Sequence, residues 1–191
     1  MNPAAPGPRV VLVGPPGAGK TTVARELAAR LGVAARDTDA DVEAVAGRTV
    51  AEIFVDEGEP RFRELELDAV LLALTSHDGV LALGGGSVLD PRIEAALAGH
   101  TVVFLDVGIA DAAKRIGFNK ERPLLMMNPR AQWVALMDGR RATYERVATH
   151  RVDTAGRSAA EVADDIVALL ASLAGPAGPG GPVGPAEGAT P

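Results

Sequence analysis

The sequence predicts an α/β fold of three layers, in which helices flank a five-stranded parallel sheet. Short, fully apolar segments alternate along the chain with longer segments whose apolar residues recur at helical spacing. Strands that are apolar on both faces are typical of parallel sheets covered by helices on each side. Hydrophobic residues make up 47% of the 191 residues and charged residues 23%, which is enough apolar material for the core of one domain.

Five segments are expected to be strands because they are short, apolar or β-branched, and bounded by turn residues. The clearest are residues 9–13, which end at a glycine, and the apolar runs 80–83 and 101–106. Shorter runs near 33–37 and 150–153 supply the other two strands.

Helices are expected between these strands. Residues 20–31 have apolar residues at helical spacing and stop at Gly32, a residue type that often ends helices. The same reasoning predicts further helices at about 58–76, 90–98, 109–116, 130–148 and 158–173.

The two ends of the chain differ from the rest in composition. Residues 1–8 carry three prolines and predict a flexible leader. Residues 174–191 contain six glycines and five prolines. Such a segment buries too little apolar surface to offset its ordering entropy, so a disordered tail is expected. One globular domain is therefore expected over residues 9–173.

The composition excludes several classes of protein. The absence of cysteine excludes disulfide scaffolds, cysteine nucleophiles and thiolate metal sites. A net charge of −6 argues against nucleic-acid binding. No segment approaches the ~18–20 apolar residues that a membrane span needs. The first residues also lack the basic and apolar regions of a secretory signal, so a cytoplasmic protein is expected.

One part of this acidic chain is locally basic. Residues 114–157 hold ten Lys or Arg against four Asp or Glu. Such a segment favours a small anionic ligand over a polyanion. The alternative interpretation is a set of solvated helix faces.

The segment from Gly14 to Thr21, GPPGAGKT, matches G-x-x-x-x-G-K-[ST] between a predicted strand and a predicted helix. Its glycines let backbone N–H groups surround phosphate oxygens at the helix N-terminus. Lys20 would then bridge the β- and γ-phosphates, and the Thr21 hydroxyl would ligate Mg²⁺. The alternative is a merely structural glycine-rich turn. The full pattern in this context predicts a nucleoside triphosphate site and a P-loop NTPase fold.

Candidate acceptor-site residues follow the second predicted strand. Asp37 and Asp39 lie at the carboxyl edge, where parallel sheets place ligands. On an extended segment, carboxylates two residues apart point the same way. One could hold a metal through water while the other accepts a hydrogen bond from a substrate hydroxyl. The alternative is a helix N-cap with a solvated neighbour.

Three further signals come later in the chain. Arg63 could clamp a substrate carboxylate, or could pair with Glu66 on the same helix. The glycines at 84–86 follow a predicted strand and imply a close approach of the backbone to another group. Arg122 lies in the loop-like stretch 116–129, where a lid arginine could reach the transferring phosphoryl group.

These motifs occur in the order and spacing found in the shikimate kinases: GPPGAGKT, DTD, GExxFRxxE, LGGGSV, RPLL and LMDGRRATYERVA. The chain resembles that family, in an actinobacterial type, from about residue 9 to residue 173. The resemblance implies transfer of the γ-phosphoryl group of ATP to the 3-hydroxyl group of shikimate, in the pathway to chorismate and the aromatic amino acids. It also implies a fold similar to nucleoside monophosphate kinases, with a mobile lid. No feature demands an oligomer, so a monomer is expected.

The resemblance implies a role for each matching residue. The residues implied to bind ATP are Gly17, Ala18, Gly19, Lys20, Thr21, Thr22, Arg115, Arg122 and Arg157. Those implied to bind shikimate are Asp39, Arg63, Gly84, Gly85, Gly86 and Arg140. Mg²⁺ would be held by Thr21 and, through water, by Asp37. Lys20, Asp39 and Arg122 would be catalytic, with Asp39 as the candidate base.

One stretch departs from the family pattern. The family reads R-x-P-x-Y, whereas the segment from Arg140 to Tyr144 has Ala142 in place of the proline. Arg141 is therefore a rival to Arg140 for the substrate carboxylate.

Two other functions compete with shikimate phosphorylation. The first is another small-molecule P-loop kinase, such as a gluconate kinase or a nucleoside monophosphate kinase. Arg63 and Arg140 aimed at a carboxylate, together with the pair Asp37 and Asp39, argue against a nucleotide acceptor. A neutral-sugar acceptor would not need two arginines. The second is a non-catalytic nucleotide-binding module, which the presence of Lys20, Asp39 and Arg122 argues against.

Overall fold

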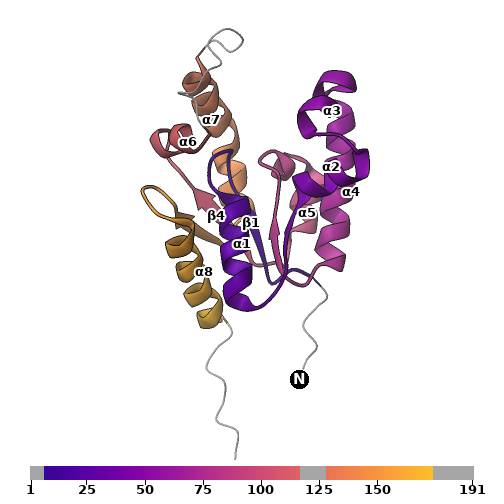
Figure 1. The fold of residues 1–191 in the computed structure, drawn as a ribbon. Helices are drawn as coiled ribbons and strands as arrows, with labels where there is room; N and C mark the ends of the chain where they lie inside the picture. Colours follow the sequence, from indigo (N-terminus) through magenta and orange to yellow (C-terminus); the bar gives the residue numbers. More distant parts are fainter. Residues whose placement is uncertain (1–6, 117–127, 174–191) are drawn as a thin grey trace, which may run out of the picture.

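The computed structural model describes residues 7–116 and 128–173 (Figure 1). Most of the expected leader (residues 1–6), the centre of the expected lid with Arg122, and the expected tail lie outside the described residues. Gly7 and Pro8, expected in the leader, are described, and Pro8 is buried.

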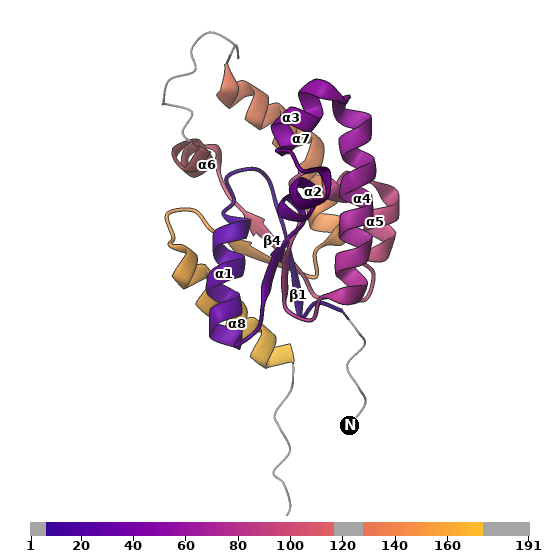
Figure 2. The same ribbon diagram turned by 45° about the vertical axis from the view of Figure 1, so that its right-hand side comes forward.

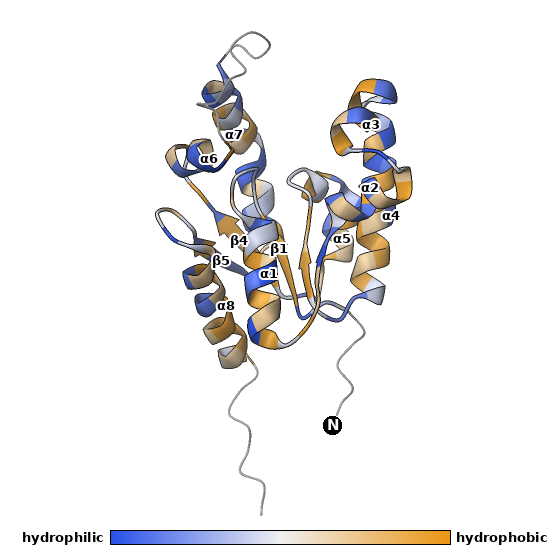
Figure 3. Cartoon of the chain, in the orientation of Figure 1, coloured by the Kyte–Doolittle hydropathy of each residue, from blue (hydrophilic) through white to orange (hydrophobic). Residues whose placement is uncertain are grey.

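The predicted five-stranded parallel sheet is confirmed, with strand order β2-β3-β1-β4-β5 and every pair parallel. The strands are β1 (Val10–Val13), β2 (Ala35–Asp37), β3 (Val80–Ala82), β4 (Val102–Asp106) and β5 (His150–Asp153). Every residue of the central strands β1, β3 and β4 is buried, as expected for strands that are apolar throughout except for Asp106 at the end of β4. Figure 3 shows this as apolar colouring on β1 and β4.

Helices cover both faces of the sheet. Their bounds are α1 (Lys20–Leu31), α2 (Thr38–Ala46), α3 (Val50–Asp56), α4 (Gly58–Ser76), α5 (Pro91–Ala96), α6 (Ile109–Ile116), α7 (Pro129–Val147) and α8 (Ala159–Leu173), with a 3₁₀ turn at Ser87–Leu89. Figure 2 shows α1 and α8 on one face and α4 and α5 on the other. None of the helices in the described ranges has the length and apolar character needed to cross a membrane.

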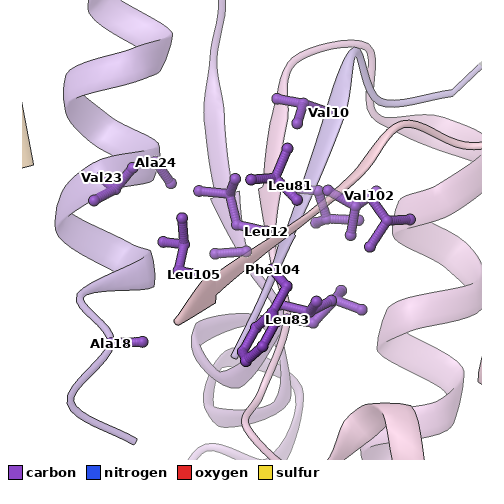
Figure 4. Close-up of a cluster of buried hydrophobic side chains, with 14 of the residues drawn as sticks. Val10, Leu12, Ala18, Val23, Ala24, Leu81, Leu83, Val102, Phe104 and Leu105 are labelled. Carbon is purple, nitrogen blue, oxygen red and sulfur yellow. The ribbon is translucent and has the colours of Figure 1, made fainter. Parts of the chain in front are cut away.

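The main core packs the sheet against helices α1, α4, α7 and α8, and its part beneath α1 lies next to the site. Leu12 of β1 and Leu105 of β4 are fully buried and face Val23 and Ala24 of α1 (Figure 4). Burying side chains of this size stabilises the fold by about 1.5–3 kcal/mol each. This core fixes the start of α1 relative to the strand ends, and so fixes the loop between β1 and α1.

Helices α2 and α3 were not expected from the sequence. The extended conformation expected for Asp37 to Asp39 is wrong, because β2 ends at Asp37 and α2 begins at Thr38. The Asp37 side chain caps α2 by accepting a hydrogen bond from the Asp39 amide. Helix α3 begins with a capping box between Thr49 and Glu52.

The additional helices have their own small core. Val42 of α2, Ile53 of α3 and Phe62 of α4 are buried against one another. This cluster anchors α2 and α3 on α4. In Figure 1 they stand on one side of the carboxyl ends of the strands, with α6 and α7 on the other side.

Candidate active site

The loop between β1 and α1 has the geometry of a phosphate cradle. Gly17 and Gly19 have positive φ angles of 82° and 89°, which suit glycine and are strained for other residues. Helix α1 begins at Lys20 without a side-chain cap. Its first amides are therefore free to bind an anion, which the helix dipole also favours.

Lys20 lies folded against this loop. Its Nζ donates hydrogen bonds to the carbonyl oxygens of Gly14 (2.8 Å) and Pro15 (3.2 Å). Burial lowers the pKa of its ammonium to about 8, although Asp39 and Asp37 act to raise it. A lysine held in this way is positioned to neutralise phosphate charge.

The two side chains expected to hold Mg²⁺ meet beside the loop. The Thr21 hydroxyl donates a hydrogen bond of 2.6 Å to Asp37 Oδ2, while Asp37 Oδ1 caps α2. Asp37 therefore serves as the N-cap and also faces Thr21, so the two interpretations of the Asp-x-Asp pattern are compatible. Within the described ranges, no cluster of three or more acidic, histidine or cysteine residues could hold a metal. An oxygen pair next to a phosphate cradle fits Mg²⁺, which usually binds few carboxylates together with phosphates and water.

Asp39 presents a buried oxygen that lacks a protein partner. Its Oδ1 has no hydrogen-bond partner among the described residues. Burial, together with the nearby carboxylates of Asp37 and Glu66, raises the pKa of the Asp39 carboxyl to about 6. Buried polar atoms in proteins almost always have partners. An acceptor without a partner in the described ranges is available to a hydrogen-bond donor of a ligand, and a hydroxyl group is one such donor.

The turn at residues 84–86 gathers the other acceptor-site residues. The Gly84 amide donates to Thr38 Oγ1, and a Cβ at Gly84 would lie 2.5 Å from Asp39 Oδ1. A Cβ at Gly86 would lie 2.6 Å from Arg63 Nη1. Any side chain at these positions would displace the functional groups, which explains the requirement for glycine.

Arg63 forms the pair with Glu66 that one of its two sequence interpretations expects, and the clamp on a substrate carboxylate stays a prediction. It forms ion pairs with Glu66 (2.7 Å) and Glu59 (2.8 Å), and it also lies against the glycine turn. Glu66 is only 2% exposed and also accepts a hydrogen bond from Ser87. The sequence argument named Glu66 only as an ion-pair partner. A charged residue on the apolar stripe of α4, four residues after Phe62, is the signal that points to a positioning role.

Arg140, and not Arg141, faces the glycine turn. Arg140 Nη1 donates to the Gly85 carbonyl at 3.2 Å, and the Tyr144 hydroxyl donates to the same oxygen. Arg141 is instead bound to the buried Asp106 by two hydrogen bonds of 3.0 and 2.9 Å. Of the two arginines, Arg140 is therefore the one that contacts the glycine turn.

A cavity of about 190 Å³ lies beside the start of α1. Arg115 and Arg157, expected next to the adenine, both line it, together with Gly19 and Thr22. Arg115 is fixed by hydrogen bonds to the carbonyls of Gly17, Ala18 and Thr154. The expected adenine-flanking residues are therefore together, and next to the phosphate cradle.

Comparisons with known proteins agree on one family. A family profile described as shikimate kinase matches residues 16–171. Curated shikimate kinases from Streptomyces avermitilis and Salinispora arenicola are each 56% identical to this chain, over 84% and 86% of it and 94% and 98% of their own length. A solved shikimate kinase from Acinetobacter baumannii in complex with shikimate is similar, with a TM-score of 0.80, 34% identity, and coverage of 87% of this chain and 94% of that one. The shikimate kinase from Aquifex aeolicus matches with a TM-score of 0.74 and 28% identity, over 86% of this chain and 97% of that one.

Proposed function

This chain belongs to the shikimate kinase family, and on that premise we propose which of its residues carry the reaction. The enzyme transfers the γ-phosphoryl group of ATP to the 3-hydroxyl group of shikimate. One observation carries the residue assignment. The buried, unpartnered Asp39 Oδ1 lies against the glycine turn that also contacts Arg63 and Arg140.

Shikimate is a small anion with one carboxylate and three ring hydroxyls. Arg63 and Arg140 hold the carboxylate, since planar guanidinium groups bind carboxylates through paired hydrogen bonds. They approach the same turn from α4 and α7 respectively. With the carboxylate fixed at this end, a ring hydroxyl lies at Asp39 Oδ1.

ATP occupies the adjoining half of the site. The backbone amides of residues 17–22 bind its phosphates, Lys20 neutralises their charge, and the cavity lined by Arg115 and Arg157 receives the adenine. Arg122, which lies outside the described residues, supplies a further positive charge to the transferring group. Thr21 and, through water, Asp37 hold the Mg²⁺ ion, which neutralises phosphate charge when bound.

The transfer is a direct in-line displacement, without a phosphorylated enzyme. In phosphoryl transfer, the protein mainly positions the reacting groups and neutralises the charge of the phosphates. Asp39 orients the attacking hydroxyl and accepts its proton. A pKa of about 6 suits this role, because the carboxylate is ionised at neutral pH and still basic enough to take a proton.

We further propose that the enzyme is a monomer in the cytoplasm, as expected from the sequence. The glycine turn, the phosphate cradle and the cavity beside α1 lie next to one another in a single fold, which is compatible with this proposal. A net charge of −6 also makes nucleic acid an unsuitable partner.

A coupled assay of ADP release tests the proposal. The protein is incubated with MgATP and, in separate reactions, with shikimate, gluconate or nucleoside monophosphates. Release that depends on shikimate alone is expected, and Arg63→Ala and Arg140→Ala should weaken that dependence. Shikimate kinetics unchanged in both variants would remove these arginines from the acceptor site.

A further inference from the structure

One face of α7 contacts both halves of the site. Trp133, Met137, Arg140 and Tyr144 recur at intervals of three or four residues and therefore share this face. Arg140 and Tyr144 contact the Gly85 carbonyl at the acceptor end. The roles assigned above use only Arg140 and leave Trp133 unexplained.

Trp133 contacts the nucleotide end. Its side chain is buried, with 7% exposed, and its indole N–H donates a hydrogen bond of 3.0 Å to the Pro16 carbonyl. Pro16 lies in the phosphate-binding loop, directly before Gly17. The C=O and N–H of a trans peptide unit point in opposite directions. Holding the Pro16 carbonyl on the outside therefore turns the Gly17 amide toward the inside of the loop.

The next two carbonyls of the loop are held in a similar way. Arg115 Nη1 donates to Gly17 O and to Ala18 O, both at 3.2 Å. Three consecutive carbonyls thus bind side chains of α6 and α7. In the described part of the chain, nothing accepts a hydrogen bond from the amides of Gly17 or Gly19. The Ala18 amide between them donates to the Pro15 carbonyl at 3.2 Å. Backbone amides that are free and face the inside of a loop form an anion-binding concavity.

The other side of Pro16 is also confined. A Cβ at Gly85 would lie 3.2 Å from Pro16 Cδ, so the glycine turn packs against the proline ring. Pro16 therefore lies between the glycine turn and the indole of Trp133. The hydrogen bond from the indole N–H to the Pro16 carbonyl fixes the rotation of the peptide unit between Pro16 and Gly17.

We propose that Trp133 is a positioning residue for the nucleotide phosphates, and that it acts by holding the Pro16 carbonyl so that the Gly17 amide faces the bound phosphate. The inference rests on the proposed nucleotide site. It goes beyond that site by giving α7 a role in binding ATP in addition to its role in binding shikimate. The competing explanation is that the indole only fills space in the core.

Trp133→Phe separates these explanations, because phenylalanine keeps an aromatic ring but cannot donate a hydrogen bond. The Kd for MgADP, by calorimetry, and the KM for MgATP should each rise about threefold to tenfold, the range expected for one neutral hydrogen bond. The KM for shikimate should stay within about twofold. Met137→Leu, a volume-conserving change at a buried position on the same face, serves as the control and should leave all three constants unchanged.

Equal nucleotide constants in Trp133→Phe and wild type would overturn the proposal. An equal loss for shikimate and nucleotide would also overturn it, since that pattern indicates a general packing defect. If Trp133→Phe fails to fold, a benzothienyl analogue of tryptophan at position 133 replaces only the N–H by sulfur and decides the same question. Wild-type protein that bound no MgADP would refute the proposed nucleotide site itself, which the variants do not test.

Discussion

The nucleotide half and the acceptor half of the site differ in how the chain builds them. The phosphate cradle is one continuous segment between β1 and α1, and most of its contacts are backbone groups. The acceptor half combines Asp39, Arg63, the turn at 84–86 and Arg140, which come from four separate segments. A local motif can therefore define the phosphate cradle, whereas the acceptor half exists only once the sheet has assembled.

The halves also differ in how their charges are held. Lys20 donates hydrogen bonds to backbone carbonyls, whereas Arg63 forms ion pairs with the carboxylates of Glu59 and Glu66. Asp39 has an oxygen without any partner in the described ranges. The acceptor half therefore depends on charged side chains that hold one another in place. We expect a single substitution in this half to affect its neighbouring side chains as well.

The largest effect is expected in the nucleotide half. Lys20→Ala should lower kcat by about 10³-fold, because removing a preorganised charge from the transferring group typically costs 10² to 10³. The melting temperature should change little, since in the described part of the chain the hydrogen bonds of the lysine go to loop carbonyls. Steady-state kinetics and thermal unfolding check the two statements. Substantial turnover in this variant would contradict the nucleotide assignment.

Asp39→Asn should lower kcat by roughly 10²-fold, because it removes the acceptor of the hydroxyl proton. In wild type, kcat/KM for shikimate should fall as the pH drops through about 6, where the carboxyl becomes protonated, and the variant should lose this dependence. The dependence of kcat and of kcat/KM on pH, measured for both proteins, tests these expectations. If kcat/KM of the variant still fell as the pH dropped through about 6, the group that titrates there would not be Asp39.

The raised pKa of Asp39 also predicts a stability effect. Because burial raises this pKa above its ordinary value of 3.8, the folded protein binds a proton between about pH 4 and 6 that the unfolded chain releases. Ionised Asp39 therefore destabilises the fold above pH 6. Asp39→Asn should raise the free energy of unfolding by about 1–2 kcal/mol at pH 7, with the gain lost near pH 4. Denaturant unfolding at both pH values measures this.

A smaller effect distinguishes the adjacent arginines of α7. Arg141→Ala should leave the KM for shikimate within about twofold while reducing stability by about 1 kcal/mol, because the buried Asp106 loses its ion pair with Arg141 and keeps the one with Arg151. Arg140→Ala should instead leave stability nearly unchanged and raise the KM for shikimate about tenfold or more. A large KM effect at position 141 would reverse the assignment of the two residues.

The sequence predicted the sheet because its central strands are uninterrupted apolar runs, and it located the phosphate loop because that motif is contiguous. It could not place α2, because Asp37 is both a helix cap and a partner of Thr21, and either role explains the pattern. Nor could it choose between Arg140 and Arg141. That choice depends on Asp106, which lies 35 positions away in the sequence at the end of β4.

The most direct test of the central claim, that Arg140 binds the shikimate carboxylate, compares shikimate with its carboxamide analogue in wild type and in Arg140→Ala. Replacing the carboxylate should lower kcat/KM in wild type by about tenfold or more, since a charge-assisted hydrogen bond is lost. The same replacement should cost Arg140→Ala much less, because the partner of the carboxylate is already absent. Equal losses in the two proteins would show that Arg140 and the carboxylate do not interact, and would contradict the account of the acceptor half.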